Sequence, residues 1–288
     1  MNSFPFQTAQ TEEEIHHPSI IFKLQNALYS INSKHVESIL SVPDYEKIPN
    51  APNNIIGVFA FRTGMIQILD LRAMLGKVSL QSELTDFQQM IAARRQDHIN
   101  WVNELERTTQ SGETFTLTNN PHKCALGKWY DQFTSDNKGV MFYLKKMEEP
   151  HRLLHASIDE IERSKEIADP KARARKQAFI LRCARTEYMP KVIQSLEKAL
   201  DSFQTSVNQA IILVLKDDSD EHHIGLMVDE VLAVENFLPS TVQHAFQSIQ
   251  KSPYIRGIGK CEKVAGDILE IDAASVISSV IHAPAEED

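Results

Sequence analysis

The sequence predicts an α+β protein in which one β domain is interrupted by an inserted antiparallel helical bundle. Val and Ile account for 33 of the 163 residues outside positions 81–205 but for only 10 of the 125 residues inside them. Because β-branched residues favour strands, the flanks predict strands and the middle block predicts helices. Net charge divides the same way, with −10 in the flanks and +1 in the middle. We expect the β domain at residues 15–80 and 206–282, and the helical insertion at residues 81–205.

The flanks contain short strand-like runs separated by Gly, Pro and Asp residues. We expect strands at residues 19–31, 35–42, 55–61, 65–71, 210–215, 225–234, 254–259 and 264–271. The Thr63-Gly64 pair is typical of a hairpin turn. Neither flank alone has enough strands to close a small barrel, so both flanks are expected to build a single β domain.

Apolar periodicity in the middle block predicts about four helices with short links, which is typical of a small antiparallel bundle. The first helix covers residues 84–105, and a short helix covers residues 124–133. Pro150 and Pro170 are each expected to open a further helix, because proline is favoured in the first turn.

The composition excludes several classes of protein. The 288 residues carry a net charge of −9 with scattered Lys and Arg, which does not favour binding to nucleic acid or to an anionic membrane. The longest apolar runs, such as residues 210–215, are too short to insert across a bilayer. The first residues resemble no secretory signal, so we expect a cytoplasmic protein. Three widely spaced cysteines indicate no disulfide framework.

Three histidines and one cysteine are expected to face the interior of the bundle. His98 continues a seven-residue apolar spacing, so it occupies a core-facing position of the first helix. His151 and His155 lie one turn apart and continue into the apolar stripe of the second helix, while Cys124 heads the short helix. Three imidazoles and a thiolate suit tetrahedral Zn²⁺. The spacing alone leaves open a metal site or histidines bonded to carbonyls or water.

The strings His98-Ile-Asn-Trp101, Cys124-Ala-Leu-Gly-Lys-Trp-Tyr130 and His151-Arg-Leu-Leu-His155 resemble the chemoreceptor zinc-binding (CZB) domain over about residues 83–203. That family is a helical bundle that holds zinc with three His and one Cys. The resemblance therefore implies one Zn²⁺ per chain, held by His98, Cys124, His151 and His155. It also implies sensing of zinc or of an oxidant such as hypochlorous acid, with Cys124 as the redox switch, and it allows a homodimer.

The flanks resemble the CheW family of chemotaxis coupling proteins. The resemblance rests on the residues from Gly57 to Leu71, on Gly225-Leu-Met-Val-Asp229-Glu-Val231 and on Tyr254-Ile-Arg-Gly257. It covers most of residues 19–80 and 207–280, and it implies a pair of small β-barrels without catalytic activity. The implied role is an adaptor that couples chemoreceptors to the histidine kinase CheA.

Three positions near the expected partner-binding residue depart from the CheW pattern. Ala60, Thr63 and Gln67 stand where Asn, Gly and Pro are usual, whereas Arg62 keeps the position that resembles the receptor-facing arginine. Arg62 is therefore the expected partner-binding residue.

Two alternatives to a zinc sensor remain open from the residues. The zinc could be purely structural, or the His151-x-x-x-His155 spacing could belong to a zinc hydrolase. Arg152 argues against a hydrolase, because it stands where that motif needs a glutamate as general base. His122 is a candidate for a competing metal ligand, but it lies on no apolar stripe, which disfavours it. Cys183 and Cys261 are expected to be structural. His222-His223 is expected at a solvated hairpin tip, and His16-His17 in a polar tail.

Overall fold

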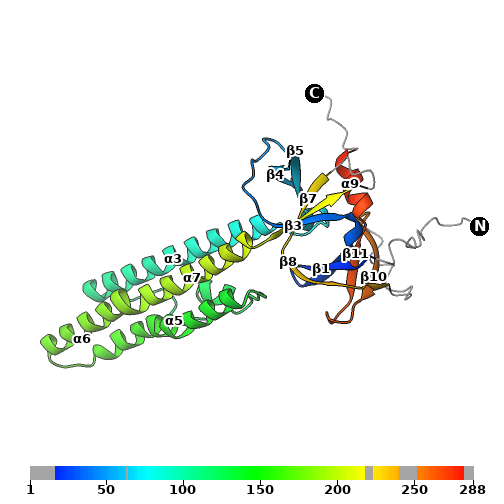
Figure 1. Ribbon diagram of the computed structural model, residues 1–288. Coiled ribbons are helices and arrows are strands. Elements are labelled where there is room, and N and C mark those ends of the chain that lie inside the picture. Colours follow the sequence, from blue (N-terminus) through cyan, green and yellow to red (C-terminus); the bar gives the residue numbers. More distant parts are fainter. Residues whose placement is uncertain (1–16, 63, 218–222, 240–251, 282–288) are drawn as a thin grey trace, which may run out of the picture. The chain divides into compact units, whose positions relative to one another are not determined.

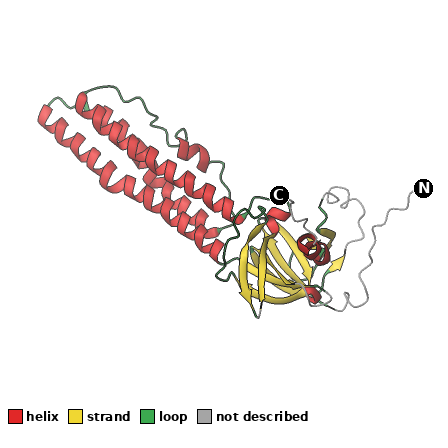
Figure 2. Ribbon diagram, turned by 90° about the horizontal axis from the view of Figure 1, so that it is seen from above, coloured by secondary structure: helices red, strands yellow, loops and turns green. Residues whose placement is uncertain are grey.

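The computed structural model describes residues 17–62, 64–217, 223–239 and 252–281. The chain divides into two compact units, Met1–Leu80 with Val207–Asp288, and Gln81–Ser206. Strands gather in the first unit and long helices in the second (Figures 1 and 2). The predicted α+β class, with a β domain interrupted by a helical bundle, is confirmed. None of the described helices is long and apolar enough to cross a membrane.

The β unit consists of two mixed sheets. The first has the order β8-β1-β2-β11-β10-β9 and the second β3-β6-β7-β5-β4. Their bounds are β1 Ser19–Leu24, β2 Ala27–Asn32, β3 Val36–Ser41, β4 Ile55–Phe61, β5 Gly64–Asp70, β6 Ile211–Lys216, β7 His223–Val228, β8 Glu230–Glu235, β9 Leu238–Pro239, β10 Ile255–Lys260 and β11 Ile268–Ile271. Each sheet pairs strands from both flanks, and the strands curl around a core in Figure 2.

Side chains of both sheets share the main core of this unit. Phe22 and Ile31 from the first sheet pack in one cluster with Leu213 and Leu226 from the second. Two short helices, α2 (Leu71–Met74) and α9 (Ala273–Ile281), add further apolar side chains to the same cluster. These two helices and β9 were not expected from the sequence.

A buried ion pair braces the β unit. Arg72 of α2 is 4% exposed, and its Nε donates to Oδ1 of Asp229 at 2.7 Å. The other oxygen of Asp229 accepts from the backbone N–H of Gln25, also at 2.7 Å. Asp229 therefore links the turn between β1 and β2 to the helix that follows β5.

Two predicted strands are each two strands. The run 19–31 breaks at Gln25, which has a left-handed φ of 53°, and the run 225–234 breaks at Asp229. Neither turn contains Gly or Pro. The hydrogen bond from Gln25 to the Asp229 carboxylate stabilises the first turn, and this contact between distant residues has no local signal. The run 264–271 forms a strand only from Ile268. The β4–β5 hairpin is confirmed, although Thr63 lies outside the described residues.

The helical unit has three long helical stretches and one short helix. Their bounds are α3 Leu80–Ser111, α4 Ala125–Tyr130, α5 Lys138–Ser164, α6 Pro170–Cys183, the π-helical turn η2 Ala184–Tyr188 and α7 Met189–Asn208. Asn137, which caps the start of α5, also donates to Oγ of Ser206 near the end of α7 at 3.0 Å. The two helices therefore run antiparallel.

Two expectations for the helices are wrong. Pro150 lies inside α5, although Pro170 does open α6 behind the capping carboxylate of Asp169. Pro150 leaves only the carbonyl of Lys146 without its helical N–H donor, and Lys146 is exposed, so water can replace that donor. The link between α3 and α5 is also long, since it spans residues 112–137 and contains α4.

Two apolar clusters fill the interior of the helical unit. One gathers around Phe87, Leu144 and Leu196, and the other around Trp101, Leu105 and Ile158. Along α3, the position of His98 falls between the residues of the first cluster and those of the second. The helical unit thus carries a polar layer between two apolar ones.

Candidate metal centre

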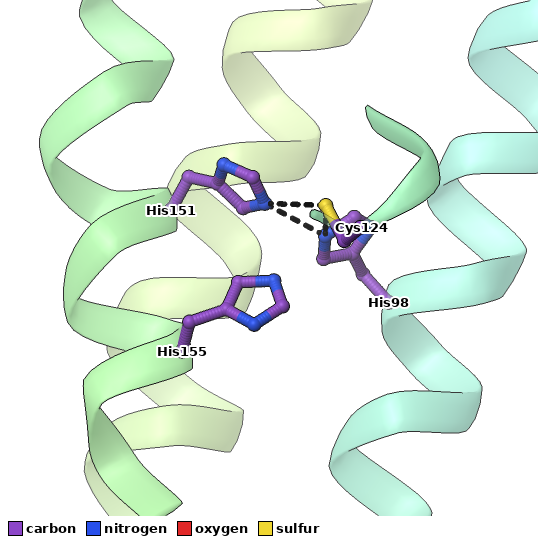
Figure 3. A group of neighbouring side chains, drawn as sticks. All are labelled: His98, Cys124, His151 and His155. Carbon is purple, nitrogen blue, oxygen red and sulfur yellow. Dashed lines mark hydrogen bonds between the residues drawn. The ribbon is translucent and has the colours of Figure 1, made fainter. Parts of the chain in front are cut away.

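The structure brings together the three histidines and the cysteine that the sequence predicted. His98 comes from α3, His151 and His155 lie one turn apart on α5, and Cys124 directly precedes α4 as its N-cap (Figure 3). One ligand atom from each residue falls in a group whose members all lie within 4.8 Å of one another. The histidines are buried and Cys124 is half-buried.

The distances between these atoms suit a single small ion. Nε2 of His98 lies 3.0 Å from Nε2 of His151, and Sγ of Cys124 lies 3.3 Å from the latter and 4.0 Å from the former. A tetrahedral zinc site with bonds of about 2.0–2.1 Å to nitrogen and about 2.3 Å to sulfur has edges of about 3.3–3.6 Å. The four residues therefore need only small shifts to surround one zinc ion.

Hydrogen bonds to the second ring nitrogens orient two of the histidines. Nδ1 of His98 donates to the carbonyl of Arg94 at 2.8 Å, and Nδ1 of His155 donates to the carbonyl of Thr118 at 3.0 Å. These bonds leave the lone pair of each Nε2 free for a metal. Nε2 of His155 is buried and has no hydrogen-bond partner among the described residues. A metal ion would satisfy this orphaned atom.

Burial also sets the protonation of the group. It lowers the pKa of His98, and together with the neighbouring imidazoles it lowers the pKa of His151 to about 2 and that of His155 to about 4. The imidazoles are therefore neutral at pH 7, which is the form that binds metals. Burial raises the pKa of the Cys124 thiol. A thiolate at this position thus requires a cation beside it.

The contacts of Gly127 explain why a glycine stands at this position, three residues after Cys124. Its N–H donates to Sγ of Cys124 at 3.2 Å, and as a thiol Cys124 donates to the carbonyl of Pro121 at the same distance. A Cβ on Gly127 would lie 1.8 Å from that carbonyl oxygen. Only glycine lets the chain before Cys124 lie this close to α4.

The other residues singled out in the helical unit lie outside this group. His122 is exposed and its Nδ1 lies 3.0 Å from Oδ1 of Asp131. Cys183 ends α6 and is half-buried. Arg152 is exposed and pairs with Glu149. The group therefore contains no carboxylate among the described residues.

In the β unit, Arg62 follows β4 with a left-handed φ of 52°, and its side chain is 66% exposed and pairs with Glu37. His223 is not at a solvated tip, because it begins β7 and its Nε2 lies 2.8 Å from a carboxylate oxygen of Glu37. His222 and His16 lie outside the described residues. Cys261 follows β10 and is half-buried.

Sequence reasoning missed the outer contacts of the histidine group. The carbonyl of Thr118 accepts from His155 and also from Nε1 of Trp101, at 3.0 Å. The three-residue spacing places Trp101 on the helix face of His98, but it does not reveal the hydrogen bond from the indole N–H to this carbonyl. Thr118 accepts these hydrogen bonds through its backbone carbonyl, and every residue has such a carbonyl, so the residue type gives no signal.

Comparison with known proteins gives two family matches. Residues 18–99 match the CheW-like domain, and residues 98–162 match the chemoreceptor zinc-binding domain. The second range contains all four residues of the group. No curated protein matches the chain.

Among solved structures, the chain is similar to the scaffolding protein TtCheW from Thermoanaerobacter tengcongensis. The TM-score is 0.38 and the identity 12%, over 94% of this chain and 97% of that one. A likeness of this size carries no conclusion about function. By its two family matches, the chain combines a CheW-like domain with a chemoreceptor zinc-binding domain.

Proposed function

We propose that this protein is a chemotaxis adaptor whose helical unit holds one zinc ion through His98, Cys124, His151 and His155, with Cys124 as an oxidant-responsive ligand. The observation that carries the proposal is the group itself, in which four ligand atoms lie within 4.8 Å. The buried and unpartnered Nε2 of His155 supports it, because an imidazole is costly to bury without a partner.

The donor set favours a sensor or a structural centre over an enzyme. Four protein ligands close a tetrahedral site and leave no position for water or substrate. Arg152 is exposed and paired with Glu149, so it offers no general base to the group. The matched domains belong to signalling, which agrees with an adaptor that has no catalytic activity.

Cys124 is the proposed ligand that an oxidant can reach most easily. It is half-buried, whereas the three imidazoles are buried. When bound, zinc keeps this sulfur as a thiolate at neutral pH. Hypochlorous acid transfers its oxygen to the thiolate, giving a sulfenic acid and chloride, so sulfur loses two electrons and the oxidant gains them. Because Cys124 is also the N-cap of α4, loss of its bond to zinc would allow the start of that helix to move.

The test is elemental analysis of protein purified without chelator, before and after hypochlorous acid, with oxidation mapped by peptide mass spectrometry. We expect one zinc per chain, lost as Cys124 is oxidised ahead of Cys183 and Cys261. A protein without zinc would contradict the metal site. Retention of zinc while another cysteine reacts first would instead indicate an adaptor with purely structural zinc.

The β unit supplies the adaptor role, since the CheW-like match supports coupling of chemoreceptors to CheA. Arg62 offers an exposed cation for a receptor, and Glu37 holds its side chain. Arg62→Glu should weaken receptor pull-down by about tenfold, because it replaces attraction by repulsion. An exposed charge elsewhere in the β unit, Lys260, provides the control in Lys260→Glu. Equal loss of binding in the two variants would exclude a specific role for Arg62.

A further inference from the structure

The segment of residues 115–124, here named the latch segment, joins two points that both touch the histidine group. Cys124 at its end contributes a ligand sulfur, and Thr118 contributes the carbonyl that orients His155. Only five residues separate these two points. A displacement of one point is therefore transmitted to the other over a short stretch of chain.

The carbonyl of Thr118 accepts two hydrogen bonds. Nε1 of Trp101 and Nδ1 of His155 both donate to it at 3.0 Å. A carbonyl oxygen has two lone pairs, so these donors fill its capacity. Trp101 thus holds the latch segment in the one place where the segment can orient His155.

Trp101 also forms a wall of the group. It is 5% exposed, and its ring centroid lies 4.9 Å from that of His155 and 5.1 Å from that of Phe115. Phe115 begins the latch segment, so Trp101 lies between the segment and a histidine of the group. A surface contact adds to this attachment, because Nδ2 of Asn119 donates to Oδ1 of Asp159 at 2.9 Å.

We propose that the latch segment gates the release of zinc, and that Trp101 is the positioning residue that holds the segment closed. This inference rests on the proposed function. Zinc leaves only when its ligands separate, and two of the four ligands are fixed by this segment. Release of zinc therefore requires the Thr118 carbonyl to lose its hydrogen bonds from both Trp101 and His155.

The first test compares rates of zinc loss to a chelating dye. Trp101→Phe removes the indole N–H but keeps an aromatic ring, and we expect zinc loss about tenfold faster, as for other changes in the outer contacts of a metal site. Trp129→Phe is the matched control. Trp129 packs on Phe87 and Phe133 in the other apolar cluster, so this variant should stay within about twofold of the original rate. Equal rates in the two variants would overturn the latch.

The second test uses fluorescence, since the chain has only two tryptophans. In Trp129→Phe, Trp101 is the only indole and reports directly on the latch segment. We expect its emission to shift to the red as zinc is removed, with the same rate constant as zinc loss. A merely structural tryptophan would give no such shift, and unchanged emission would overturn the proposal.

A third pair of variants serves if Trp101→Phe does not fold. Asn119→Ala and Asp159→Ala each remove the exposed contact, and either should accelerate zinc loss about threefold, as expected for one surface hydrogen bond. Glu149→Ala, an exposed change on the same helix as Asp159, should leave the rate of zinc loss unchanged. If Asn119→Ala and Asp159→Ala lose zinc no faster than Glu149→Ala, the latch is overturned. A wild-type protein without zinc would instead overturn the proposed function, and the latch with it.

Discussion

The buried ion pair of the β unit and the buried histidine layer of the helical unit differ in how their polar atoms are paired. In the β unit, the buried guanidinium of Arg72 meets the carboxylate of Asp229, which also accepts from Gln25. In the helical unit, three imidazoles share one layer, and Nε2 of His155 has no partner among the described residues. The β unit thus pairs this buried charge with its own groups, whereas the histidine layer of the helical unit leaves a buried nitrogen that a metal ion would satisfy. This difference indicates which of the two units responds to metal.

The largest expected effect follows from removing zinc. At a free zinc concentration of about 1,000 times Kd, binding stabilises the folded form by about 4 kcal/mol. Chelation should therefore lower the melting temperature of the helical unit and leave that of the β unit unchanged. Differential scanning calorimetry measures both transitions. A β transition that moved with the helical one would contradict the independence of the two units.

The converse variant acts on the β unit. Asp229→Ala leaves Arg72 as a buried charge without its carboxylate, which costs about 3–5 kcal/mol. The β transition should fall while zinc content stays at one per chain. The ion pair of the exposed Lys263 with Glu235 is the control, because Lys263→Ala removes a solvent-screened interaction and should leave the β transition nearly unchanged. Loss of zinc in Asp229→Ala would show that the metal site depends on the β unit.

A smaller effect is expected at the glycine beside the cysteine ligand. The Cβ of Gly127→Ala would lie 1.8 Å from the carbonyl oxygen of Pro121, so the chain before Cys124 must move. Zinc affinity should fall about 10–100-fold, as measured by competition with a chelator.

The control for this variant lies in the same long connection. Gly112 has a φ of +75°, and no atom lies within 4 Å of its added Cβ. Gly112→Ala therefore strains the backbone locally but should leave zinc affinity unchanged. Similar losses in both variants would indicate a general effect on the connection rather than displacement of Cys124.

Local patterns were enough to predict the histidine group. A seven-residue spacing places His98 on the inner face of α3, and a four-residue spacing places His151 and His155 on one face of α5. Helical periodicity fixes such faces whatever the rest of the chain does. Periodicity therefore accounts for the inward faces of the three histidines, whereas Cys124 joined the predicted ligand set through the resemblance to the CZB domain.

The features that the sequence did not reveal depend on distant contacts. The turn at Gln25 is fixed by Asp229, which is 204 residues away. Pro150 lies inside α5 because packing of the apolar face on both sides of it outweighs the loss of one helical hydrogen bond. The carbonyl of Thr118 takes part through the backbone and not through its side chain. None of these arrangements leaves a periodic signal.

X-ray absorption at the zinc edge tests the central claim most directly. For the protein purified without chelator, the account predicts one sulfur at about 2.3 Å and three nitrogens at about 2.0–2.1 Å. In Cys124→Asp, the sulfur should be replaced by an oxygen while zinc stays bound. A wild-type spectrum without sulfur, or an unchanged sulfur signal in Cys124→Asp, would contradict the assignment of Cys124 and the three histidines as the zinc site.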